Sequence, residues 1–185
     1  MRVVVATPPA PVISTAEAKA HLRVDGSDDD ALIDSYIASA TAHIDGPAGW
    51  LDCAIGVQTL EARLDRLDGD IVLPFPPVVD IVSVSYLTAG GATAVLAPTG
   101  YELFGNQLST AWNASWPATA SRREAVRVQY RAGYDVVPYA IRAAILLMVG
   151  DLYANRETAV TGISAASVPM STTVAALLGP FRVFA

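Results

Sequence analysis

The chain has 185 residues, of which 52% are hydrophobic and 16% charged, and its net charge is −6. This composition excludes an intrinsically disordered protein and is sufficient for one substantial hydrophobic core. The twelve lysines and arginines are scattered along the chain, which argues against a surface that grips DNA phosphates irrespective of sequence. The single cysteine, Cys53, excludes an internal disulfide, and we expect it to be a small buried side chain.

The N-terminal stretch MRVVVATPPAPVIS predicts an extended arm over residues 1–13. Pro8, Pro9 and Pro11 lack N–H donors and favour polyproline geometry. The apolar run is too short for a signal peptide. The longest apolar stretch of the chain, AAILLMVG, is far shorter than the roughly 20 residues of a membrane-spanning helix. We therefore expect a chain that is made in the cytosol and does not associate with a membrane.

Two helices are predicted within residues 15–46. Ser14 is suited to cap the first of them, and Glu17 stands three residues later, which is the spacing of a capping box. Ser27 or Asp28 is expected to cap the second helix, whose first turn is rich in aspartate, and a Gly-Pro pair ends it. Its apolar residues recur at intervals of three and four, namely Leu32, Ile33, Tyr36, Ile37, Ala40 and Ile44.

From about residue 57 to residue 134 the apolar period becomes that of strands. In VQTLEARL every second side chain is expected on one face, and VRVQYRA alternates in the same way. The inward positions of these two stretches are Gln58, Leu60, Ala62, Leu64, Val126, Val128 and Tyr130. Turn residues recur about every ten positions, so we predict four to six short strands in a small antiparallel sheet.

Helical periodicity returns over residues 137–156, with Ile141, Ala144, Ile145, Met148 and Leu152 on one face. Residues 161–173 are small and polar and predict a linker. The expected fold is therefore α+β, with one domain over residues 1–160. It is a bundle of two N-terminal helices and one long C-terminal helix with an inserted small antiparallel sheet, and an extended tail follows at 161–185.

A search for chemical motifs finds no catalytic, cofactor or metal site. The acidic stretch DGSDDD lacks the ligand spacing of a calcium loop, and helix capping accounts for its carboxylates. His21 and His43 have no second histidine or cysteine at metal-binding spacing. Trp112 and Trp116 flank a loop and are expected either to cover the core or to anchor a contact between subunits.

Four stretches, in this order, resemble the head–tail connector (adaptor) proteins of tailed bacteriophages and gene transfer agents. They are ISTAEAKAHLRVDGSDDDALIDSYIASATAHID, LPFPPVVDIVSVSYLTAGG, VRVQYRAGYDVVPYAIRAAILLMVGDLYANRE and LLGPFR. The resemblance covers most of the chain. It departs from the family in the long loop around Trp112 and Trp116 and in the proline-rich first residues.

The resemblance implies a structural protein of the particle neck and not an enzyme. It implies a ring of about twelve copies that binds the portal protein, presents a surface to the stopper protein and lets double-stranded DNA pass through its lumen. An acidic lining would repel the phosphates of that DNA. The alternatives are another neck protein, such as a stopper or tail terminator, or a small ligand-binding domain. The long helix at 137–156 argues against the former.

The apolar C-terminus raises a separate question, because soluble chains usually end in polar residues. We expect six residues to form a portal-binding tail: Val174, Leu177, Leu178, Pro180, Phe181 and Arg182. The small polar linker would let this tail reach away from its own domain. The alternative is that the tail folds back onto the helices of its own chain.

Overall fold

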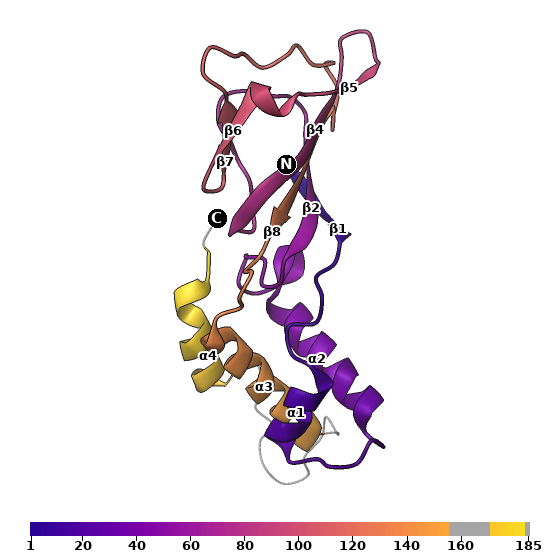
Figure 1. Ribbon diagram of the computed structural model, residues 1–185, viewed down its shortest axis with the longest axis vertical. Helices are drawn as coiled ribbons and strands as arrows, with labels where there is room; N and C mark the ends of the chain where they lie inside the picture. Colours follow the sequence, from indigo (N-terminus) through magenta and orange to yellow (C-terminus); the bar gives the residue numbers. More distant parts are fainter. Residues whose placement is uncertain (156–170, 184–185) are drawn as a thin grey trace.

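The computed structural model describes residues 1–155 and 171–183. The molecule is elongated, with the helices gathered at one end and the strands at the other (Figure 1). The described helices are α1 (Thr15–Leu22), α2 (Asp30–Ile44), α3 (Tyr139–Ala154) and α4 (Thr172–Leu178), with 3-10 turns at Gly46–Ala48, Pro98–Gly100 and Gly179–Phe181. The described strands are β1 (Arg2–Thr7), β2 (Gln58–Leu64), β3 (Ile71–Val72), β4 (Val78–Leu87), β5 (Thr93–Val95), β6 (Tyr101–Phe104), β7 (Gln107–Thr110) and β8 (Val126–Ala132). The predicted α+β class is confirmed.

Helix α1 begins at its predicted cap. The Ser14 hydroxyl accepts a hydrogen bond from the Glu17 backbone N–H at 3.2 Å. The Glu17 carboxylate does not complete the capping box. It accepts a hydrogen bond from the guanidinium of Arg142 on α3 at 2.5 Å. The same guanidinium donates to the backbone carbonyl of Val12 at 2.7 Å. One arginine thus ties the N-terminal segment and α1 to the long helix.

Helices α2 and α3 pack through the apolar stripes that the sequence indicates. The fully buried side chains of the two helices are Ile33, Ile37, Ala40, Ile44, Ile141, Ala144, Ile145 and Val149. Leu152 is exposed, which corrects the prediction. Because Val149 follows Ile145 by four positions, it continues the stripe in place of Leu152. The N-cap of α2 is Asp29, one residue beyond the predicted Asp28 and two beyond Ser27. The Asp29 carboxylate accepts a hydrogen bond from the Tyr153 hydroxyl at 2.5 Å.

The strands form a five-stranded antiparallel sheet in the order β1-β2-β8-β4-β5 and a three-stranded antiparallel sheet in the order β3-β7-β6. Strand β8 lies at the centre of the larger sheet. Its pairing with β2 brings Leu60 opposite Tyr130 and Ala62 opposite Val128. All four of these side chains are completely buried. The predicted inward faces of these two strands are therefore confirmed, with Leu64 half-buried at the end of β2.

Two clusters of buried apolar side chains stabilise the molecule. One lies among the helices and includes Ile13, Leu51 and Cys53 from the connecting segments. The other includes buried residues of both sheets, such as Leu73 and Leu108. The sheet region is thus more than a small insertion, and it contains eight strands where four to six were predicted. The predicted N-terminal arm is also wrong for residues 2–7, which form β1. The prolines begin only at residue 8 and therefore withdraw no donor from that strand.

A half-buried carboxylate joins the two ends of the molecule. The Asp45 carboxylate, just after α2, accepts from the Ile55 backbone N–H at 2.6 Å and from the Gln58 side-chain amide at 3.0 Å. Gln58 is itself only 3% exposed. Burial raises the pKa of Asp45 above its ordinary value, and the hydrogen bonds from Ile55 and Gln58 oppose that shift. This cluster fixes the end of α2 against the beginning of β2.

We predict that Asp45→Ala lowers the free energy of unfolding by about 1.5–3 kcal/mol, because it leaves buried donors without an acceptor. Asp45→Asn keeps an acceptor and should cost less.

The pKa of Asp45 is raised in the folded chain, so protonation of Asp45 favours folding. The stabilisation that protonation of Asp45 provides therefore increases as the pH falls through the pKa of the folded chain. It is complete once the pH is below the pKa of the unfolded chain, which is about 3.9. Urea unfolding at several pH values measures both effects. A pH dependence of the unfolding free energy that is the same in Asp45→Asn as in the wild-type chain would contradict the assignment.

Candidate assembly surfaces

The C-terminal segment packs onto the helical end of its own chain. Helix α4 is capped by Ser171, whose hydroxyl accepts a hydrogen bond from the Val174 backbone N–H at 3.3 Å. The side chains of Val174 and Leu178 are completely buried in the helical cluster. Figure 1 shows α4 lying alongside α3. Two apolar side chains of this segment thus belong to the core.

Beyond α4 the chain is held by contacts with residues that the sequence reasoning did not single out. The Phe181 ring meets Tyr134 edge-on, with centroids 6.4 Å apart. The Arg182 guanidinium lies 4.4 Å from the centroid of the Trp50 ring, a cation–π distance. The Val183 backbone N–H donates to the Leu51 carbonyl at 2.9 Å. No sequence signal links these partners, because they lie far from the tail along the chain.

These contacts correspond to the alternative in which the tail folds back onto the helices of its own chain. The apolar core of that chain encloses Val174 and Leu178. Leu177, Phe181 and Arg182 are half-buried and Pro180 is exposed. Most of the predicted linker at 161–173 lies outside the described residues.

The two loop tryptophans have different environments. Trp116 packs against the sheet cluster, and its indole N–H donates to the Gly69 carbonyl at 2.8 Å. Trp112 is 89% exposed, and its neighbour Asn113 has a positive φ of 60° at the loop tip. Trp116 therefore acts as a cover of the core, one of the two roles expected. Trp112 presents a large apolar surface to the outside.

We predict that Trp116→Ala destabilises the fold by about 1–3 kcal/mol, because it removes a partly buried ring from the sheet cluster together with its hydrogen bond to the Gly69 carbonyl. Trp112→Ala should change the free energy of unfolding by less than about 0.5 kcal/mol, because its ring is exposed. Thermal unfolding of the two variants side by side measures the difference. Equal losses would show that the two rings have equivalent roles.

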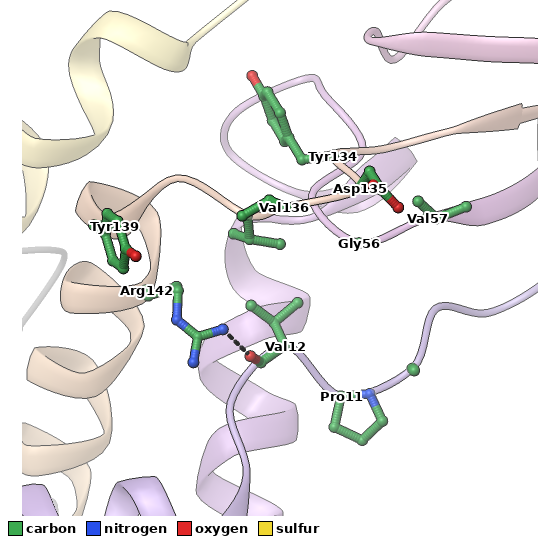
Figure 2. A pocket seen from close by; sticks show the side chains of 11 residues that line it. Pro11, Val12, Gly56, Val57, Tyr134, Asp135, Val136, Tyr139 and Arg142 are labelled. Carbon is green, nitrogen blue, oxygen red and sulfur yellow. Dashed lines mark hydrogen bonds between the residues drawn. The ribbon is translucent and has the colours of Figure 1, made fainter.

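A groove of roughly 620 Å³ lies where the helical end meets the sheets. Its lining comes from three separate parts of the chain: Ala10, Pro11, Val12, Gly56, Val57, Tyr134, Asp135, Val136, Val137, Tyr139 and Arg142. On the helical side of the groove, Arg142 donates a hydrogen bond to the carbonyl of Val12 (Figure 2). Its polar groups are few, and Arg142 is committed to the contacts already described. The groove therefore offers no convergent set of groups for catalysis or for a polar ligand.

A glycine sets the backbone geometry behind this groove. Gly133 follows β8 with φ of +125°, and a Cβ at this position would lie 2.2 Å from the carbonyl oxygen of Gly56. The next residue, Tyr134, donates its backbone N–H to the Ile55 carbonyl at 2.9 Å. Close backbone approach at this point requires a glycine. It leads the chain from the sheet to α3.

Charge is distributed unequally between the two ends. Residues 1–9 and 57–134 carry seven arginines and seven acidic side chains. The whole net charge of −6 therefore lies in the remaining residues, which include the four described helices. The helical end is consequently the end that repels phosphate most strongly.

The described side chains that could take part in catalysis or metal binding, Cys53 and the two histidines, do not lie together. The Cys53 side chain is 1% exposed, and burial, reinforced by Asp45 and Asp52, raises the pKa of its thiol to about 12. It is therefore protonated and unreactive at neutral pH. His21 and His43 are exposed on separate helices. Residues 1–155 and 171–183 contain no group of three potential metal ligands. Among the same residues no helix is long and apolar enough to span a membrane.

Comparisons with known proteins give two positive findings. Residues 13–74 match the sequence profile of the family described as "Phage gp6-like head-tail connector protein". The whole chain also has the fold of a chain in the "Neck of empty GTA particle computed with C6 symmetry", with a TM-score of 0.74, 22% identity, and coverage of 100% of this chain and 97% of that one. A search of curated proteins found no match.

Two further solved structures contain the same fold. A chain of the "Virion of native gene transfer agent (GTA) particle" is 21% identical with a TM-score of 0.76. One of the "Neck of native GTA particle computed with C12 symmetry" is 18% identical with a TM-score of 0.65. Both comparisons cover 100% of this chain and 97% of the other.

The architecture is therefore one that occurs in the necks of gene transfer agent particles. Residues 13–74, which run from the segment before α1 to just past β3, are similar to the phage gp6-like head-tail connector family. The predicted resemblance to the phage head–tail connector family is confirmed, and that family is one of structural proteins.

Proposed function

We propose that this protein is a head–tail connector of a phage or phage-like particle, assembled in the host cytoplasm and located in the neck. It joins the DNA-filled head to the stopper and the tail. The observation that carries this proposal is the likeness of fold along the entire chain to neck chains, together with the family match at residues 13–74. The groove and the isolated histidines supply no competing catalytic function.

The working form is a closed ring of about twelve copies under the portal. The C12 symmetry reported for one of the similar neck structures supports this number. A closed ring needs two different side surfaces that fit each other. The exposed Trp112 at the sheet end is a candidate for one such contact, since aromatic side chains contribute strongly to interfaces.

The C-terminal segment contacts the portal in this proposal. The buried side chains of Val174 and Leu178 fix the segment to the helical end of its own chain. The contact surface for the portal then consists of the half-buried or exposed residues Leu177, Pro180, Phe181 and Arg182. The stopper then binds another face of the ring. Repetition of a small contact around the ring raises the total affinity through avidity.

Double-stranded DNA passes through the lumen without specific binding. The acidic helical end supports this role, because it disfavours contact with phosphates. Electrophoretic mobility of a short duplex should accordingly be unchanged by the protein at physiological salt.

Cryo-electron microscopy of purified particles tests the proposal. We expect density for about twelve copies in a ring between the portal and the tail. A single copy per particle, a trimer, or a position at the tail tip would overturn it. Particles in which only this chain carries a small tag provide the matched control for assigning the density.

A further inference from the structure

The larger sheet has two unpaired edges, one on each side. Strands β1 and β5 each pair with one neighbour, β2 and β4 respectively. Within residues 1–155 and 171–183, the backbone groups of residues 2–7 and 93–95 make no hydrogen bond outside those two pairings. Free N–H and C=O groups on a strand edge are a template for pairing with another chain.

Strand β1 lacks most of the features by which proteins protect such an edge. Its sequence RVVVAT contains three consecutive valines and no lysine or proline. Its single charge, Arg2, is held by Glu124 at 3.0 Å, and its one irregularity lies near the far end, between Val5 and Thr7. The outer strands of the smaller sheet are less suitable, since β3 has only two residues and β6 carries an outward Glu102.

The directions of the two edges select the symmetry of the contact. All pairings in the sheet are antiparallel, so β1 and β5, separated by three strands, run in the same direction. Rotation about a ring axis leaves strand direction along that axis unchanged. It therefore joins β5 of one copy to β1 of the next as a parallel pair. A two-fold axis would instead pair β1 with β1.

Side chains alternate between the core face and the polar face of the sheet along both edges, so residues on the same face can be matched across a contact. On β1, Val3 and Val5 lie opposite Ala62 and Leu60, on the face of the sheet core, and Val4 lies on the polar face. On the β5 edge, Ala94 lies opposite Tyr86 and Leu96 packs against the core, so Val95 is on the polar face.

We propose that a second copy of this chain occupies each edge. The parallel register is Val3 beside Ala94, Val4 beside Val95, and Val5 beside Leu96. In this register the core face of one copy continues into that of the next. A slip by one residue would exchange the two faces. Val95, which is 69% exposed, and Val5, which is 44% exposed, are both covered by the contact. The proposal supplies the side contact of the ring and rests on the proposed function for the closure of that ring.

Disulfide trapping tests the register. Within one chain, residues 4 and 95 are four strand spacings apart, about 19 Å, so Val4→Cys/Val95→Cys cannot form an internal disulfide. We expect the oxidised double variant, as full-length protein at assembling concentrations, to give a ladder of oligomers on denaturing gels. Each single variant is the matched control and should stay monomeric, with the native Cys53 buried.

Three other outcomes would overturn the edge pairing, and a fourth would overturn the proposed function instead. A dimer from Val4→Cys alone would show a two-fold β1 contact. Rings seen by microscopy that give no ladder would place the subunit contact elsewhere and leave the connector function intact. Absence of the protein from particle necks would instead contradict the proposed function, whatever the ladder shows. A protein that does not associate at all would also reject the pairing.

A charge on the edge gives an independent measurement. Val95→Lys should raise the concentration needed for assembly by about tenfold or more, because an edge lysine opposes strand addition. Val136→Lys, which changes a valine that is 78% exposed away from both edges, is the matched control and should assemble normally. Equal effects of the two lysines would contradict the proposal.

Discussion

A chain that ends at residue 170 should lose roughly 3–6 kcal/mol of stability, because the truncation removes the fully buried side chains of Val174 and Leu178. The loss should appear as a lower urea midpoint and as exposure of the helical cluster. Val174→Ala/Leu178→Ala in the full chain should reproduce most of it. Ala176→Ser, at an exposed position of the same helix, is the matched control.

This result bears directly on the tail. A truncated chain that melts like the full one would mean that the segment contributes little to its own domain, and would favour a tail free to insert into the portal. The contacts of Phe181 with Tyr134 and of Arg182 with Trp50 argue for the opposite outcome.

Particles produced without this protein should contain DNA-filled heads that carry no tails. The reason is that the proposed ring is the layer on which the stopper and tail assemble. Electron microscopy and a count of tailed particles measure the effect, and expression of the wild-type chain in trans should restore tails. Tailed particles of normal number in its absence would contradict the proposed function.

His21→Gln/His43→Gln/Cys53→Ala is the matched chemical control for that experiment. We assign no catalytic or metal-binding role to these three side chains. The variant should fold, with a modest loss from the small cavity at Cys53, and should support tail assembly. Loss of tails from a folded triple variant would reveal a chemical role for at least one of them.

Features set by neighbouring residues could be predicted from the sequence. The cap at Ser14 is a contact over three positions, and the alternation in VRVQYRA reflects one strand between a core and a polar surface. The apolar period of α2 likewise identified its buried face. Each of these features depends on residues only a few positions apart, so it can be read from the sequence without knowledge of the tertiary structure.

Features set by distant residues could not be predicted. Strand β1 depends on β2, some fifty positions later, and its sequence is followed closely by prolines that suggested an arm. The path of the C-terminus depends on Trp50, Leu51 and Tyr134, which carry no signal of that role. The separate roles of Trp112 and Trp116 depended on which ring could reach the Gly69 carbonyl.

The central position of β8 has a consequence for synthesis on the ribosome. Strands β2 and β4 have no common partner until residues 126–132 have been made, since each pairs with β8 and not with the other. The helical end likewise waits for α4, the last helix described. The sheet cluster therefore cannot be completed before β8 has been made, and the helical cluster cannot be completed before α4 has been made. The valine-rich strand β1 is among the first segments to be made and must wait for the centre of its sheet through most of synthesis.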